Sequence, residues 1–273
     1  MKKLLRGLVV LVCVIVLGIS IARLTGLDDK ILYWVKNRQV AEVAPDMAAL
    51  EDPAVESEEE NAEAQSSEPA AEHQQGSQFE AVWDSLDQLK SQNGDLIGWL
   101  TMEGTEIDYP VVQAADNDYY LRRGFDGSKL YTGTLFMDYQ CRPDCGGLYS
   151  IIYGHNIKSG MMFQCLGDYQ KQDYFTAHQY GWYVTPEAAY RLEALALCLT
   201  DTESPLVAPP GENIRDDLTA ITQEINEKAV QLADGAALRE DDHLLVLSTC
   251  AYDFQGARYI LVTRARQVAV RER

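Results

Sequence analysis

The pattern that most constrains the fold is a series of eight short apolar runs, separated by turn residues, in the second part of the chain. The runs cover residues 96–101, 107–112, 134–137, 148–153, 181–185, 190–199, 244–249 and 258–263. Each run has the length of a β-strand, and regular helices do not alternate with them as they would in a parallel α/β sheet. We therefore expect a mainly β fold in which eight strands form an antiparallel or mixed barrel.

Two segments of this domain have apolar residues at helical steps instead. The first opens the domain and ends before Asn93-Gly94; it contains Phe79, Val82, Trp83, Leu86 and Leu89. The second follows Pro209-Pro210-Gly211 and contains Ile214, Leu218, Ile221, Ile225 and Leu232. This spacing predicts an N-terminal helix and a long helix inserted between the sixth and seventh strands.

The N-terminus has the charge and hydropathy pattern of a membrane anchor. Lys2, Lys3 and Arg6 precede an uncharged apolar run from Gly7 to Ala22. A helix of that length covers roughly 24 Å, and basic side chains at both ends can extend the span by snorkelling. The basic residues predict a cytoplasmic N-terminus, so residues 1–23 form a single-pass anchor and the remainder is extracytoplasmic. A cleaved signal peptide is the alternative, and it also implies export.

Residues 24–78 connect this anchor to the domain, which we place at residues 79–273. Residues 24–38 are amphipathic and predict a juxtamembrane helix, whereas residues 39–78 are rich in Ala, Glu, Ser and Gln and contain neither Lys nor Arg. Such a composition buries too little apolar surface to fold alone. We therefore expect an acidic, disordered spacer that holds the domain away from the bilayer.

The charge of the chain bears on its partners. The net charge is −19, and both the N-terminal 78 residues and the remaining domain contain more acidic than basic side chains. A basic stripe of the kind that binds phosphate backbones is therefore missing from the sequence, which argues against nucleic-acid binding.

Three polar residues stand where apolar runs begin or end. His155 follows an apolar run and a glycine, Cys250 ends the seventh run, and Arg258 opens the eighth. A thiolate is a nucleophile, an imidazole can accept and return a proton, and a guanidinium can stabilise developing negative charge. Separately, such residues are more often a small core thiol, a structural histidine and a surface arginine. Together they predict an acyl-transfer site that requires no metal or other cofactor.

The residues around these three resemble those of sortases, the cysteine transpeptidases that attach surface proteins to Gram-positive cell walls. Leu247-Ser248-Thr249-Cys250 followed by Arg258 is similar to the sortase signature, and Tyr153-Gly154-His155-Asn156 is similar to the family's histidine motif. The order His, Cys, Arg also fits sortases, whereas papain-like and NlpC/P60-like peptidases have the cysteine before the histidine.

Further segments resemble class B sortases in particular, and the resemblance covers about residues 79–266. These segments are residues 98–100, 104–105, 107–112, 116–121 and 133–138, together with the two predicted helices. Class C sortases have an Asp-Pro-aromatic lid and a second membrane span at the C-terminus. Here Ala54 follows Asp52-Pro53 and no second apolar span is present, which argues against class C.

The resemblance implies the eight-stranded sortase barrel and a defined reaction. Cys250 attacks the threonine carbonyl of a sorting signal on a surface protein, His155 transfers protons, and Arg258 assists. An amine of a peptidoglycan precursor or cross-bridge then resolves the thioacyl-enzyme. Asn117, Leu121 and Ser248 correspond to substrate-binding positions, although Leu121 could be core and Asn117 a helix cap. Pilin polymerisation, hydrolysis by water and a catalytically silent binding module are the alternatives.

The other cysteines and histidines lie outside this signature. One Cys-x3-Cys pair offers too few ligands for a zinc site, so we assign no metal and expect reduced or locally paired structural cysteines. These are Cys141, Cys145, Cys165 and Cys198, with Cys13 inside the predicted span. We interpret His73, His178 and His243 as incidental.

Overall fold

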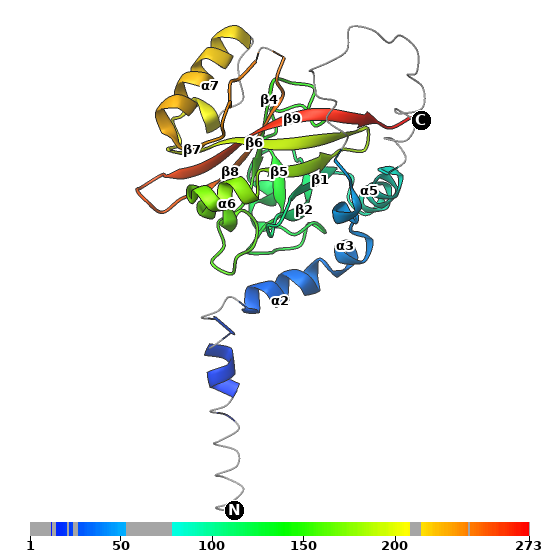
Figure 1. Cartoon of the computed structure of the whole chain (residues 1–273). Helices are drawn as coiled ribbons and strands as arrows, with labels where there is room; N and C mark the ends of the chain where they lie inside the picture. Colours follow the sequence, from blue (N-terminus) through cyan, green and yellow to red (C-terminus); the bar gives the residue numbers. More distant parts are fainter. Residues whose placement is uncertain are drawn as a thin grey trace, which may run out of the picture.

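The structure is a computed structural model (Figure 1). It describes residues 12, 15–20, 22–23, 27–52, 78–207, 214–239 and 241–272.

Eight strands close a mixed barrel, as the sequence predicts, and a ninth strand extends it. The strands are β1 (Leu96–Met102), β2 (Asp108–Val112), β3 (Leu135–Met137), β4 (Tyr149–Tyr153), β5 (Tyr180–Val184), β6 (Ala188–Thr200), β7 (Ala229–Leu232), β8 (Leu244–Cys250) and β9 (Arg258–Val270). Their order is β5-β1-β2-β3-β4-β8-β9-β6, and pairing of β5 with β6 closes the ring. The β2–β3 and β4–β8 pairs are parallel. The barrel has no free edge except where β7 is added to β6.

The ninth strand corrects one detail of the predicted inserted helix. Helix α7 spans Ile214–Lys228, and the chain then changes to β7 instead of continuing as a helix to Leu232. Leu232 lies at a helical step from Ile225, which explains the prediction, but its side chain is exposed. Pairing with β6 determines the conformation there.

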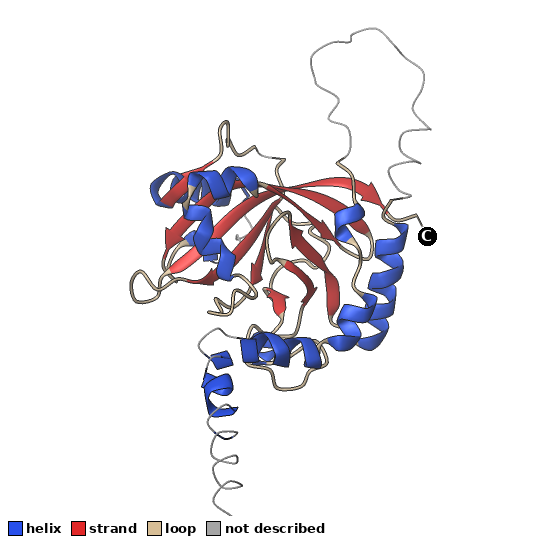
Figure 2. Cartoon of the chain, turned by 60° about the horizontal axis from the view of Figure 1, so that its bottom comes forward, coloured by secondary structure: helices blue, strands red, loops and turns tan. Residues whose placement is uncertain are grey.

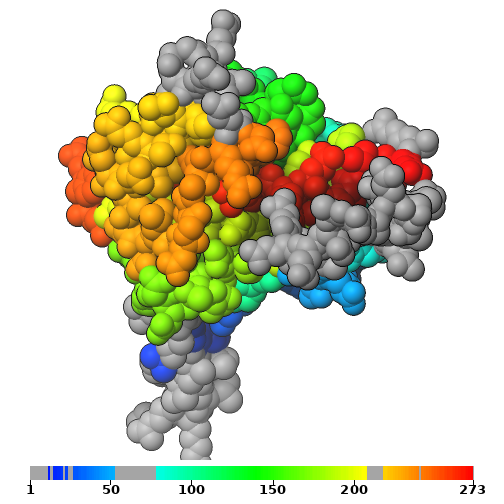
Figure 3. All heavy atoms as spheres, turned by 45° about the horizontal axis from the view of Figure 1, so that its top comes forward, coloured from blue at the N-terminus to red at the C-terminus, as the bar shows by residue number. Residues whose placement is uncertain are grey.

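Helices cover the outside of the barrel (Figure 2). They are α2 (Leu27–Lys36), α3 (Arg38–Val43), η1 (Met47–Ala49), α5 (Glu80–Gln92), η2 (Tyr119–Arg122), η3 (Gln164–Gln170), α6 (Gln172–Ala177), η4 (Pro205–Val207) and α7. Helix α5 buries its apolar face in one cluster, with the Phe79 ring, next to its start, 5.6 Å from that of Trp182. Helix α7 packs on another side through Ile221 and Ile225, where it forms a block on the molecular surface (Figure 3).

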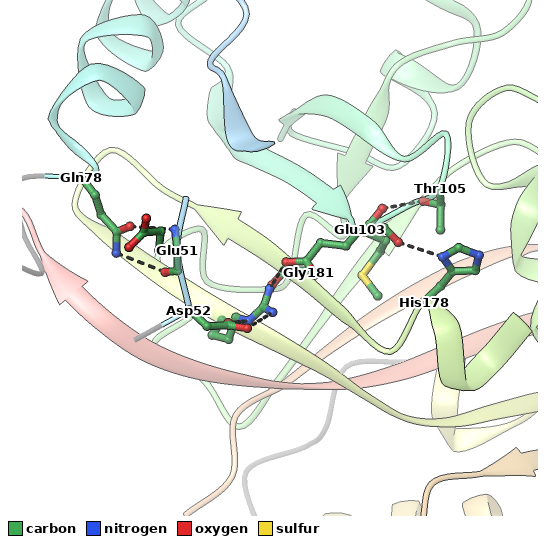
Figure 4. Close-up of polar contacts among 9 residues, drawn as sticks. Glu51, Asp52, Gln78, Glu103, Thr105, His178 and Gly181 are labelled. Carbon is green, nitrogen blue, oxygen red and sulfur yellow. Dashed lines mark hydrogen bonds and ion pairs between the residues drawn. The ribbon is translucent and has the colours of Figure 1, made fainter. Parts of the chain in front are cut away.

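Residues 38–52 correct the predicted boundary of the spacer, because they pack on the domain. Val40 and Met47 are buried in the same cluster as α5. Asp52 forms an ion pair with the buried Arg191, whose guanidinium also pairs with Glu103 (Figure 4). The few apolar residues of this segment thus pack on the apolar surface that the folded domain already provides. The composition of the segment alone does not predict this packing.

The chain leaves this part of the domain and returns to it at neighbouring positions. The Gln78 side chain accepts a hydrogen bond from the Glu51 backbone N–H at 2.9 Å and donates one to the Glu51 carbonyl at 3.4 Å (Figure 4). Residues 53–77 lie outside the described residues. Because both flanks are held on the domain, this segment does not set the distance between the domain and residues further towards the N-terminus.

The predicted membrane span, from Gly7 to Ala22, lies partly outside the described residues. Within the ranges that the structure describes, no helix combines the length and apolarity needed to cross a bilayer.

Candidate active site

The strand register brings His155, Cys250 and Arg258 to one rim of the barrel. In the parallel β4–β8 pair, Tyr153 lies opposite Ser248, so His155 and Cys250 each follow these partners by two residues. In the antiparallel β8–β9 pair, Cys250 lies directly opposite Arg258. Directly opposed residues in an antiparallel pair have adjacent side chains. Three positions that are far apart in the sequence thus become neighbours.

Arg258 contacts the thiol of Cys250. The distance from the Arg258 Nη1 to the Cys250 Sγ is 2.5 Å, and the cysteine side chain is only partly buried. A guanidinium remains protonated in a protein, so this contact places a permanent positive charge beside the sulfur. Negative charge on the sulfur, or on an oxygen that develops next to it, is stabilised by that charge.

His155 is held in the neutral state by its surroundings. Burial lowers its pKa, a backbone hydrogen bond at Leu121 opposes this, and the positive charge of Arg122 lowers the pKa further. The His155 Nε2 donates to the Leu121 carbonyl at 2.7 Å, because a carbonyl oxygen can only accept. In this neutral tautomer Nδ1 carries the free lone pair.

A cleft of about 410 Å³ joins these groups with the predicted substrate-binding residues. All six residues singled out from the sequence line it. Among the described residues, the lining consists of Asn117, Leu121, Phe136, Tyr153, Gly154, His155, Thr202, Val207, Ser248, Thr249, Cys250 and Arg258. Most of this lining is apolar or uncharged, as is usual for a ligand-binding cleft.

Asn117 is positioned by a buried carboxyl group. Its Nδ2 donates to the Asp138 Oδ2 at 2.8 Å, and its Oδ1 accepts from the Tyr139 N–H at 3.1 Å. The Tyr153 hydroxyl donates to the same Asp138 oxygen at 3.1 Å. Burial and the Asp138 charge raise the pKa of Tyr153, so its hydroxyl keeps its proton. Leu121 is partly exposed on the cleft wall, whereas Ser248 is buried.

Thr249 and Asn156, which the sequence analysis named only as parts of motifs, connect the strand end before His155 to the strand end at Cys250. The Thr249 Oγ1 donates to the Gly154 carbonyl at 2.7 Å, and the Asn156 Nδ2 donates to the Cys250 carbonyl at 2.9 Å. Their positions next to the histidine and the cysteine were visible, but a cross-strand bond requires the parallel register. Asp138 was likewise missed, because its role depends on its contact with Asn117.

The remaining described cysteines differ from Cys250 in burial. Neither Cys250 nor any of the other four described cysteines is in a disulfide. Burial raises the pKa of Cys141 to about 11 and those of Cys145, Cys165 and Cys198 to about 12. These four are thus unreactive thiols at neutral pH. Cys13 lies outside the described residues.

The other histidines make backbone contacts away from the cleft. His178 bonds the Glu103 carbonyl through Nδ1 at 3.0 Å (Figure 4), and His243 bonds the Gly147 carbonyl at 3.0 Å. His73 lies outside the described residues. Across the described ranges, no group of three His, Cys, Asp or Glu side chains is arranged to hold a metal ion.

Comparisons with known proteins agree with this geometry. The sortase domain family matches residues 100–268, more than half of the chain. Sortase B of Listeria monocytogenes is 33% identical over 185 residues, covering 66% of this chain and 73% of that protein, and sortase B of Staphylococcus aureus is 28% identical over 192 residues, covering 70% and 78%. A solved Staphylococcus aureus sortase B–substrate complex superposes with a TM-score of 0.63 at 26% identity, covering 68% of this chain and 86% of that structure. The chain therefore belongs to the sortase family of cysteine transpeptidases, and within it to class B.

Proposed function

We propose that this enzyme cleaves a sorting signal near the C-terminus of surface proteins and transfers them to an amine of a cell-wall precursor or cross-bridge. The observation that carries the proposal is the 2.5 Å contact between Arg258 and the Cys250 thiol in a cleft that His155 also lines. A similar solved structure is a sortase B–substrate complex, which supports substrate binding by a protein of this fold.

The first half-reaction forms a thioester. The neutral imidazole of His155 accepts the Cys250 thiol proton, and the sulfur forms a bond to the carbonyl carbon of the scissile peptide bond. Arg258 stabilises the oxyanion. The C–N bond then breaks, and His155 returns the proton to the leaving amine. The lowered pKa of His155 favours this role, because the imidazole starts unprotonated at neutral pH.

The second half-reaction releases the enzyme. The acceptor amine attacks the thioester carbon, the C–S bond breaks, and an amide replaces it. His155 takes the proton that the amine loses and returns it to Cys250, so protons and electrons balance over the cycle.

Three residues of the cleft are proposed to bind the sorting signal. Leu121 offers apolar surface and Asn117 offers an amide held by Asp138, while Ser248 stands two residues before the nucleophile. A preoriented amide loses little freedom when it binds a peptide backbone.

The reaction is proposed to occur outside the cell membrane. The support comes from the sequence: an apolar N-terminal run with basic residues in front of it predicts a single-pass anchor whose C-terminal side is extracytoplasmic. The partners would then be exported proteins and cell-wall amines, both present on that side.

The test uses the full chain and a set of internally quenched peptides with different pentapeptide sorting motifs, with and without triglycine or a diamine. We expect a cleaved peptide bearing the added amine, detected by mass spectrometry, and no product from Cys250→Ala. Hydrolysis alone with every acceptor would instead identify a peptidase. In a parallel reaction with a lysine-containing pilin fragment as acceptor, a peptide joined to the lysine would identify a polymerase. No turnover of any peptide would refute the proposal.

A further inference from the structure

Helix α2 has one face that packs on the barrel. Tyr33 places its ring edge-on to that of Tyr109 on β2, with the centroids 5.9 Å apart. Asn37, one turn later, is buried and bonds the Tyr33 carbonyl through its side chain. Because Tyr33 and Asn37 are four residues apart, they lie on the same side of the helix. This side fixes how α2 is turned on the domain.

The other face of α2 is apolar and has no partner among the described residues. Leu27, Ile31, Trp34 and Val35 follow the i, i+4, i+7, i+8 spacing of one helical stripe. Their exposed fractions are 50%, 54%, 60% and 59%, respectively. A stripe of four large apolar side chains on a surface helix marks a site of interaction with another protein or a membrane.

The position of α2 in the chain identifies the membrane as the partner. Leu27 is four residues beyond Arg23, where the apolar N-terminal run ends. On the side of the predicted span where α2 lies, residues 23–38 contain 4 basic and 2 acidic side chains, whereas residues 39–273 contain 16 basic and 40 acidic ones. The stretch that adjoins the predicted span is thus basic on balance, unlike the domain as a whole, and this suits the negative surface of an anionic bilayer.

The direction of α2 fits the same partner. Its axis runs across that of the helical residues 15–20 in both Figure 1 and Figure 2. A helix that crosses the direction of a membrane span lies along the bilayer surface, and tryptophan is enriched at that depth.

We propose that α2 is an interfacial helix whose Leu27, Ile31, Trp34 and Val35 enter the lipid headgroup region. Since Tyr33 and Asn37 fix the opposite face to the barrel, this docking sets the orientation of the domain on the bilayer. The inference rests on the membrane anchoring in the proposed function and does not depend on the transpeptidation reaction.

The chain contains its own reporter for this contact. It has four tryptophans, of which Trp83, Trp99 and Trp182 are at most 2% exposed, so only Trp34 can meet lipid or solvent. We would reconstitute the full chain in liposomes with anionic lipids brominated near the headgroup. We expect quenching of Trp34 relative to unbrominated lipids and protection of Trp34 from aqueous acrylamide, with both effects absent in Trp34→Phe.

A matched control moves the reporter away from the proposed interface. In Trp34→Phe/Asn226→Trp, the new tryptophan replaces an exposed residue of α7, which lies at the far end of the molecule from α2 (Figure 1). We expect acrylamide to quench this variant and brominated lipid not to.

Three results would overturn the docking: a chain that does not co-float with liposomes, a Trp34 insensitive to brominated lipid, or equal quenching in both variants. Peptide turnover in the same samples is a separate readout. Its loss with intact lipid quenching would refute the reaction and leave the docking.

Discussion

At the residue scale, the site combines a fixed positive charge with a neutral base. Arg258 lies directly opposite Cys250 in the β8–β9 ladder, and from this position its guanidinium contacts the Cys250 sulfur. His155 is partly buried and is bonded to the Leu121 carbonyl. Groups held in this way need little rearrangement when charge develops in the transition state, which is where preorganised sites gain most of their rate.

Replacing Arg258 with lysine tests whether the planar fork matters in addition to the charge. Lysine keeps one positive charge but lacks the rigid planar fork whose N–H groups can face the sulfur and a neighbouring oxyanion together. We expect kcat for peptide cleavage to fall by about 10²–10³-fold, the effect of losing one oxyanion donor. Turnover close to that of the unaltered enzyme would show that charge alone is sufficient.

The titration of His155 gives a second prediction. Because burial lowers its pKa, an NMR titration of the full chain should show a midpoint below the usual value of about 6.5. As pH falls below that value the unfolded state binds the proton first, so the free energy of unfolding decreases towards the folded-state pKa. The stabilising contribution is thus complete above about pH 6.5.

A pair of neighbouring arginines separates the causes of this shift. Arg122→Gln should raise the His155 midpoint, because the Arg122 charge lowers the pKa, whereas Arg123→Gln should leave it nearly unchanged. A midpoint at or above 6.5 in the unaltered protein would contradict the assignment of a buried neutral imidazole.

At the scale of elements, the ends of β4 and β8 must approach closely. Gly154 follows β4, and a Cβ atom there would stand 2.6 Å from side-chain carbons of both Leu135 and Phe163. The Thr249 hydroxyl bonds the Gly154 carbonyl from the neighbouring strand. The glycine before the histidine is therefore required by packing around the strand end.

Gly154→Ala should displace this strand end. Overpacking of this kind costs about 1–3 kcal/mol of unfolding free energy. Peptide turnover should fall as well, because His155 is the next residue. Urea denaturation measures the first effect, and Gly94→Ala is the control, since nothing lies within 4 Å of a Cβ at Gly94. Equal stability of the two variants would rule out the packing argument.

The elements also show how far sequence reasoning reached. Eight apolar runs predicted the eight barrel strands, because burial on at least one face leaves a clear signal. Strand β7 exposes its larger apolar residues, Val230 and Leu232, so hydropathy gives no strand signal there, and Leu232 fits a helical step instead. All six candidate residues line one cleft, but the bonds of Thr249 and Asn156 depend on a parallel register that a single sequence does not specify.

At the scale of the whole molecule, residues 38–52 are part of the folded domain. Arg191 is buried, stacks over the ring of Trp182 at 4.7 Å and pairs with Asp52 and Glu103. A buried guanidinium requires such partners, since an unpaired buried charge is strongly destabilising. This docking could not be predicted from the sequence, because Asp52 and Arg191 are 139 residues apart in the chain.

Asp52→Asn should weaken the docking without exposing Arg191, because Glu103 remains as a partner. We expect a loss of roughly 1 kcal/mol in unfolding free energy, since Asp52 itself is largely exposed and screened by solvent. Thermal denaturation at low and high salt measures it, with the exposed Asp241, changed to asparagine in Asp241→Asn, as the control. A variant with unaltered stability at both salt concentrations would contradict the pairing.

The two bonds between Gln78 and Glu51 have a consequence for a broken chain. If a protease cut the backbone anywhere between those residues, the fragments would remain together, because Val40, Met47 and Asp52 keep their places on the barrel. Such a nick would yield two bands on a denaturing gel from an enzyme that is still fixed to its N-terminal helices. Proteolytic shedding of the catalytic domain would need a cut on the other side of α2, and this makes the acidic segment a poor site of release.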